Sequence, residues 1–179
     1  MQTHTTHGSQ AFYAIAAATL LLMCPAISEA ATIPSKWKSH ATGVCQSALP
    51  SGAGAVIRAR PLAVQNEGST NAFVTCSLPY NDTYVEQPNA NGMGLRIVNN
   101  TDSELLVTCT LVSGFDPETA YYVVRNQLIP DHLANVMWFY PSDLPGAPAT
   151  IPAPNISCSL PPGVGINYVF YYYDRQVGV

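Results

Sequence analysis

The sequence predicts an all-β protein: a single disulfide-stapled antiparallel β-sandwich of about eight strands, with Greek-key or jelly-roll-like connections. Short runs of alternating β-branched and aromatic residues recur along the chain, while helical periodicity is hard to find. Clusters of Gly, Pro, Asn and Asp separate these runs, and the chain contains 15 prolines and 12 glycines. Because both residues interrupt strands and favour turns, we expect many short strands joined by tight connections.

Residues 1–30 have the pattern of a signal peptide. Residues 11–24 form an uncharged apolar run that is too short to cross a bilayer, which takes about 20 residues. A small-x-small cleavage pattern follows and ends at Ala30, which predicts a single mature domain over residues 31–179. A lipid anchor at Cys24 is the weaker alternative, because a bulky residue precedes it. We therefore expect a secreted or periplasmic protein without a membrane span.

The strand pattern begins only after residues 31–44, which we expect to be flexible. The predicted strands, each bounded by turn residues, cover residues 53–60, 71–78, 94–99, 105–113, 119–126, 135–140, 155–160 and 166–174. Residues 141–154 are rich in proline and are predicted to form a long loop.

Four cysteines follow the predicted cleavage point: Cys45, Cys76, Cys109 and Cys158. An even number in an exported chain predicts two disulfides, and sequence alone leaves three connectivities open. Three of the four lie in a repeated pattern of apolar residue, hydroxyl residue, Cys, hydroxyl residue and Leu, as in Val74–Leu78. Period-2 geometry turns the cysteines inward and the hydroxyls outward. The unequal spacing of the copies argues against tandem repeats.

The segments around the cysteines read "GVCQSALP", "FVTCSLPY", "LLVTCTLVSG" and "ISCSLPPGVGINYVFYYYD". In this order they resemble a family of small exported, functionally uncharacterised bacterial proteins with four cysteines and a C-terminal Cys-x-Leu-Pro-Pro-Gly strand motif. The resemblance implies export, a β-rich fold, and disulfides that join Cys45 to Cys76 and Cys109 to Cys158. It supplies no activity and no catalytic residue.

No catalytic, cofactor or metal constellation is evident. His132, next to Asp131, is the only credible general base, and without a nucleophile motif we interpret it as an exposed turn histidine. The cysteine spacings do not fit a metal cluster. Oxygen-bearing residues in 81–92 could bind calcium, but they lack the EF-hand spacing. The net charge of −4, with no lysine after Lys38, disfavours nucleic acid as a partner.

The aromatic residues are the remaining candidates for a binding site. We expect Trp138 to lie in the core, because its neighbours are apolar on both sides. On the C-terminal strand, period 2 places one set of side chains together, and we assign it to the core: Ile166, Tyr168, Phe170 and Tyr172. Tyr171 and Tyr173 are then either covered by a loop or exposed. If exposed, they and Trp138 are candidate ligand-stacking residues.

These observations favour an exported, non-enzymatic binding or surface-associated protein whose exact function is unknown. A glycan or a cell-surface component is the candidate partner. One alternative is a carbohydrate-binding module that uses exposed aromatic residues. Another is a small secreted hydrolase that uses His132. Fold analogy cannot choose among them, since sandwiches support many functions.

Overall fold

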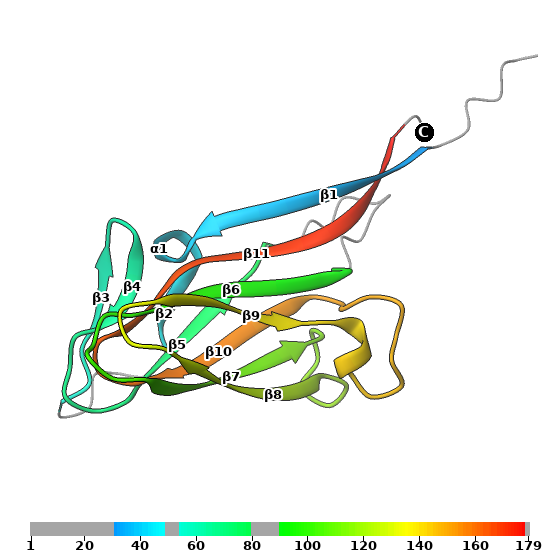
Figure 1. Ribbon diagram of the computed structural model, residues 1–179. Helices are drawn as coiled ribbons and strands as arrows, with labels where there is room; N and C mark the ends of the chain where they lie inside the picture. The colour runs from blue at the N-terminus through cyan, green and yellow to red at the C-terminus, as the bar shows by residue number, and fades with distance from the viewer. Residues whose placement is uncertain (1–30, 49–53, 80–89, 178–179) are drawn as a thin grey trace, which may run out of the picture.

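The computed structural model describes residues 31–48, 54–79 and 90–177, and they form two antiparallel sheets packed face to face (Figure 1). The predicted signal peptide lies outside these residues. Within them, no helix is long and apolar enough to span a membrane. In chain order the elements are β1 (Ala31–His40), α1 (Ala41–Val44), β2 (Cys45–Ser47), β3 (Ile57–Arg60), β4 (Ala63–Asn66), β5 (Ala72–Ser77), β6 (Gly92–Asn99), β7 (Leu105–Ser113), β8 (Tyr121–Ile129), β9 (Ala134–Phe139), the 3-10 helix η2 (Pro141–Asp143), β10 (Pro154–Leu160) and β11 (Val164–Val177).

The two sheets confirm the predicted β-sandwich. The A sheet has the strand order β3-β4-β11-β6-β9, and β1 also pairs with β11. The B sheet has the order β2-β5-β10-β7-β8. Consecutive strands lie in different sheets everywhere except at the hairpins β3–β4 and β7–β8, so the chain passes back and forth between the two sheets. Buried apolar residues from both inner faces make one core.

The residues expected to be flexible instead form β1 and the single turn of α1. β1 pairs with β11 along its whole length, from Ala31 opposite Val177 to His40 opposite Tyr168. The two strands make a long ribbon that projects beyond the rest of the sandwich (Figure 1). Trp37 anchors β1, because its ring packs against the core.

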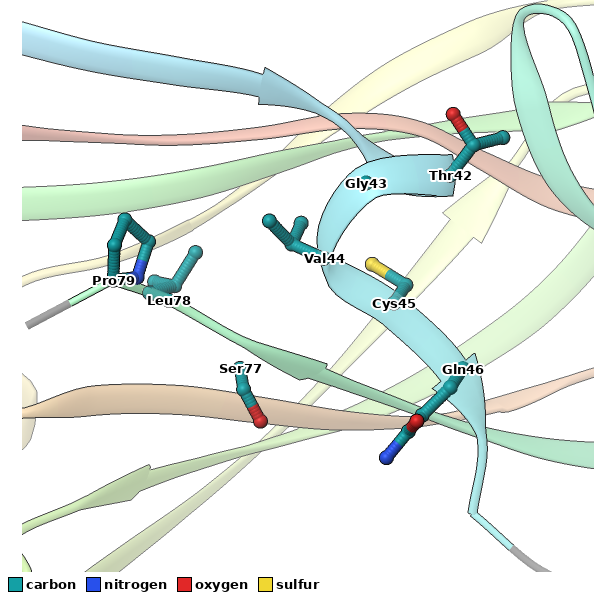
Figure 2. Close-up of a pocket in the computed structure, with 8 residues that line it drawn as sticks. All are labelled: Thr42, Gly43, Val44, Cys45, Gln46, Ser77, Leu78 and Pro79. Atoms are coloured by element: carbon teal, nitrogen blue, oxygen red, sulfur yellow. The ribbon is translucent and has the colours of Figure 1, made fainter.

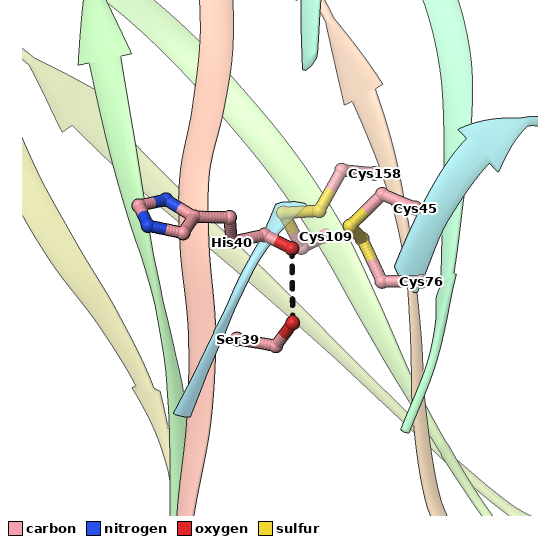
Figure 3. Close-up of a disulfide and its surroundings, with 6 residues drawn as sticks. All are labelled: Ser39, His40, Cys45, Cys76, Cys109 and Cys158. Atoms are coloured by element: carbon pink, nitrogen blue, oxygen red, sulfur yellow. Dashed lines mark hydrogen bonds between the residues drawn. A yellow bond between two sulfur atoms is a disulfide. The ribbon is translucent and has the colours of Figure 1, made fainter. Parts of the chain in front are cut away.

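Both disulfides join neighbouring strands of the B sheet (Figure 3). Cys45 and Cys76 are direct cross-strand partners on β2 and β5, and Cys109 and Cys158 are partners on β7 and β10. This is the pairing that the family resemblance implies. Cys76, Cys109 and Cys158 are fully buried, so the inward placement of the cysteines is confirmed. In the chain-entropy model each link contributes about 4 kcal/mol to the free energy of unfolding.

The C-terminal strand β11 contains a bulge that changes which residues face the core. Its pairing with β6 shifts register between Ile166 and Tyr168. Inward-facing side chains before the bulge have even numbers, whereas those after it have odd numbers, such as Val169 and Tyr171. The predicted core face is therefore correct for Ile166 and wrong beyond it. Tyr168, Phe170 and Tyr172 lie on the outer face of the A sheet, because one extra residue inverts the alternation.

Candidate ligand-binding face

The outer face of the A sheet brings together aromatic side chains from two strands that flank β6. Strand register places Trp138 of β9 and Phe170 of β11 on either side of Gly94. Tyr172 lies opposite Gly92 in the same way. Tyr140, which follows β9, is close enough to Gly92 to contact a side chain placed there. The rings from β9 and β11 thus meet above the glycines of β6.

The two glycines make room for this arrangement. A Cβ atom at Gly94 would lie 2.7 Å from the Phe170 ring and 3.1 Å from a methyl group of Val136. A Cβ atom at Gly92 would lie 3.4 Å from the Tyr140 ring, an ordinary contact distance. Glycine is therefore required more strictly at position 94 than at position 92, since any larger residue at position 94 would displace the Phe170 ring.

Three of the rings have nearly parallel planes and form what we call the aromatic platform: Trp138, Tyr140 and Tyr172. The Trp138 ring lies 5.8 Å from Tyr140 with an interplanar angle of 8°, and 6.1 Å from Tyr172 with an angle of 10°. Phe170 meets both Trp138 and Tyr172 edge-on and is only 3% exposed, so it supports the platform from below. Tyr140 and Tyr172 are 44% and 39% exposed.

A half-buried ion pair at the edge of the sandwich holds the β9 end of the platform. Arg125 of β8 reaches across the open edge of the sandwich, where it pairs with Asp143 at 2.8 Å and donates a hydrogen bond to the Trp138 carbonyl. The other carboxylate oxygen of Asp143 accepts the Tyr140 backbone N–H at 2.7 Å. Charge-assisted hydrogen bonds thus fix the backbone on both sides of Phe139.

Two lysines of β1 lie beside the rings of β11. The Lys36 ammonium is 4.4 Å from the centroid of Phe170 and 4.9 Å from that of Tyr172. The Lys38 ammonium is 3.7 Å from the centroid of Tyr168. These distances are typical of cation–π contacts, so each ammonium is attracted to a ring face while its side chain remains exposed.

Only one of the three predicted stacking residues belongs to this face. Trp138 is half-buried on the outer face, so the expectation that it lies in the core is wrong. Tyr171 faces inward, is 5% exposed, and stacks on Trp37 at 5.3 Å. Its hydroxyl donates to the Pro79 carbonyl at 3.3 Å. Tyr173 is half-buried and also packs against the core.

The burial of Tyr171 has an electrostatic consequence. Desolvation raises the pKa of its hydroxyl above the usual value for tyrosine, and the neighbouring Tyr173 hydroxyl raises it further. Folding therefore favours the neutral phenol. This is the behaviour of a structural tyrosine, and Tyr171 is not available to stack on a ligand.

His132 and its partner do not form a catalytic arrangement in the described residues. The Nε2 atom of His132 lies 2.7 Å from Asp102, and both side chains are well exposed. No hydroxyl or thiol is hydrogen-bonded to this histidine among the described hydrogen bonds. Asp131, its neighbour in sequence, is not the partner. The pair is an exposed surface contact between two turns, which contributes little to stability.

The remaining candidate features give no second site. A hollow of about 570 Å³ lies beside Cys45, between α1 and the end of β5 (Figure 2), and none of the described residues that line it is charged or aromatic. No group of three His, Cys, Asp or Glu side chains within the described ranges is arranged to hold a metal ion. Most of the candidate calcium segment, residues 81–92, lies outside those ranges.

Sequence reasoning misplaced a further member of the platform. Tyr172 was assigned to the core, because the bulge in β11 reverses the faces of that strand. One signal could have identified this surface: Gly92 and Gly94 alternate within a strand pattern. Glycine in a strand often marks a place where another group approaches closely.

Comparison with known proteins found similarity to solved structures at low TM-scores and low sequence identity. No protein-family model matches the chain, and no curated protein matches it. One similar structure concerns the promiscuous specificity of carbohydrate-binding modules of the β-sandwich superfamily, with a TM-score of 0.32 and 11% identity over 85% of this chain. The match spans 58% of that structure. The other concerns CBM4 structure and function, with a TM-score of 0.29 and 13% identity over 78% of this chain and 86% of that structure.

Proposed function

We propose that this protein is an exported, non-enzymatic module that binds glycans on the aromatic platform. The observation that carries the proposal is the near-parallel arrangement of three aromatic rings on the outer face of the A sheet, two of them substantially exposed. The paired strands β9, β6 and β11 hold the rings in place before a ligand arrives. Binding therefore needs little ordering of side chains, which would otherwise reduce the affinity.

The chemistry of the rings suits a sugar. A pyranose presents C–H groups on its faces and hydroxyls at its rim. Tyr and Trp rings offer the matching surface, since each has an apolar face and a polar group at its edge. Neighbouring rings with parallel planes can contact successive sugar units of a chain. A polysaccharide fits such a row better than a compact small molecule, which prefers a concave pocket.

Two features support export. The structure contains two disulfides, and such links persist in oxidising compartments outside the cytosol. The sequence also has an apolar N-terminal segment at 11–24 with a cleavage pattern ending at Ala30. Cleavage at that point would make Ala31, the first residue of β1, the mature N-terminus.

The proposal is tested by retention of the purified oxidised protein on a panel of immobilised plant, microbial and animal polysaccharides. We expect Tyr140→Ala and Tyr172→Ala each to lower the affinity for a retained polymer by about tenfold, because each removes one stacked ring worth about 1–2 kcal/mol. Tyr122→Ala is the matched control. Tyr122 is a more exposed tyrosine at 59%, and it lies on the B sheet.

Two results would overturn the glycan proposal. The first is retention on no polymer in the panel. The second is retention that Tyr122→Ala lowers as much as Tyr172→Ala does, because binding would then not depend on the platform. The hydrolase alternative is less favoured, since His132 lies in an exposed turn with only Asp102 as its described side-chain partner.

A further inference from the structure

We propose that the ligand of the aromatic platform is an anionic polysaccharide, with sugar units that carry carboxylate or sulfate groups. This inference rests on the proposed glycan-binding function and names its substrate class. It starts from the charges around the platform. The chain has a net charge of −4, yet the strands that form this face carry mainly cations. A local charge opposite in sign to the whole chain indicates a ligand of the complementary sign.

The cations lie where a ligand on the platform would meet them. Lys36 and Lys38 are the only lysines in the sequence, and both project from β1 to the outer face of the A sheet. Lys36 contacts the rings of Phe170 and Tyr172, and these two rings also contact Trp138. A sugar that stacks on Tyr172 is therefore adjacent to the Lys36 ammonium.

A third cation borders the platform on its central strand. Arg96 of β6 is on the same face as Gly92 and Gly94, and it lies between Val136 of β9 and Tyr168 of β11 in the strand register. Its guanidinium can bind a carboxylate or a sulfate through two parallel hydrogen bonds. Cations thus lie on both β1 and β6, along the rings of β11.

These three cations have no carboxylate partner in the described part of the chain. The ion pairs found there use Arg58, Arg60 and Arg125, and His132 contacts Asp102. On the outer-facing positions of β1, β6, β9 and β11, Asp174 is the one acidic residue within the described strands, and it lies opposite Pro34 on the projecting ribbon. Among the described residues, the positive charge beside the platform is therefore not neutralised by an ion pair.

The cation–π contacts explain how lysines can serve a stacking site. They hold each flexible side chain against a ring, which lowers the entropy that would be lost when a ligand binds. An anion on the sugar rim can then approach an ammonium group that is already in place. A neutral sugar gains nothing from these charges, so the face should distinguish charged from uncharged polymers of the same backbone.

The test uses pairs of immobilised polymers that share a backbone and differ in whether it carries an anionic group: polygalacturonate against its fully methyl-esterified form, and dextran sulfate against dextran. We expect the wild-type protein to bind at least one charged polymer about threefold to thirtyfold more tightly than its neutral partner. The pair that shows the preference identifies carboxylate or sulfate as the anion. Raising the salt concentration should reduce this preference, since the charges are exposed.

The double variant Lys36→Gln, Lys38→Gln should lose the preference for the charged polymer and retain the binding to the neutral one. Its matched control is Arg58→Gln, Arg60→Gln, which changes the net charge equally at exposed residues of β3. The control should keep the preference. Both pairs of side chains are exposed, so both variants are expected to fold, and unchanged circular dichroism checks this.

Each other outcome has a distinct meaning. Equal binding of charged and neutral polymers would overturn the anionic inference and leave the glycan proposal intact, whereas retention on none of these polymers and on no polymer of the wider panel overturns both. Loss of the preference in the arginine control would also overturn the inference, because net charge alone would then explain it. Binding to oligo(dT) without binding to either charged polysaccharide would identify a nucleic-acid ligand instead.

Discussion

His132 lies at a turn position whose backbone favours glycine. Its φ is 52°, in the left-handed region that most side chains avoid. The turn between β10 and β11 has Gly163 at the corresponding place, with a φ of 80°. Both turns begin with a proline, and in both the backbone N–H that follows the left-handed residue bonds back to that proline's carbonyl: Leu133 to Pro130 and Val164 to Pro161. The histidine thus occupies a structural turn.

We expect His132→Gly to be more stable than His132→Ala by about 1 kcal/mol, because glycine adopts the left-handed conformation without the clash that a Cβ atom produces. Loss of the exposed pair with Asp102 should contribute little to either variant. Urea unfolding of the two variants measures the difference. Equal stabilities would contradict the structural role, and glycan retention should be unchanged in both.

At the scale of single elements, β6 is the strand on which the platform depends. It pairs with β9 and β11, the two strands that carry the rings, and its glycines leave the space that those rings occupy. The opposite face of β6 points into the sandwich. Met93, Leu95 and Ile97 on that face are completely buried, so the same strand contributes large side chains to the core. One strand therefore anchors the sandwich and shapes the binding face.

Gly94→Ala tests this role of β6. The new Cβ atom would approach the Phe170 ring to 2.7 Å, so the ring must move. We expect a loss of about 1–3 kcal/mol of unfolding free energy, as in other overpacked sites, together with weaker glycan binding. Gly92→Ala is the graded control, because its Cβ atom makes only an ordinary contact with Tyr140. Equal effects of the two substitutions on binding would contradict the account.

Strands in which apolar and polar residues alternate regularly could be predicted from the sequence. Strands without this regular alternation could not. β7 matches its predicted range of 105–113, because apolar and hydroxyl residues alternate along it. β1 was missed, since it contains Pro34 and two lysines, which are uncommon in strands. The faces of β11 were inverted by the bulge near Asn167. A bulge depends on pairing with β6, and a period-2 pattern carries no sign of it.

At the scale of the whole molecule, two corners of the sandwich are built in the same way. Asn66 ends β4 and Asn99 ends β6, and both side chains are completely buried. The side-chain NH2 of each asparagine donates two hydrogen bonds: one to the backbone carbonyl four residues later in the chain, and one to the carbonyl of the last residue of a B-sheet strand. The side-chain oxygen accepts a hydrogen bond from the backbone N–H two residues later. Cys76 follows Asn66 in the chain by the same number of residues as Cys109 follows Asn99. This repeated device fixes where the chain passes between the sheets.

The two outer faces of the molecule have different characters. The A sheet presents the aromatic platform with Lys36, Lys38 and Arg96 beside it. The B sheet presents the hydroxyl residues beside the cysteines and, along β7 and β8, exposed apolar side chains: Leu106, Tyr122, Val124 and Leu128. This apolar surface of the B sheet is the main alternative binding surface for a ligand or partner. The central claim is therefore that the ligand occupies the outer face of the A sheet.

Chemical-shift mapping by NMR tests that claim most directly, using the ¹⁵N-labelled protein and an oligosaccharide of the polymer that it retains. The account predicts that the largest shifts occur at the Trp138 indole N–H and at the amides of Gly92, Gly94 and Tyr172, with little change in β7 and β8. Shifts centred on Tyr122 and Leu128, or around the hollow beside Cys45, would contradict it.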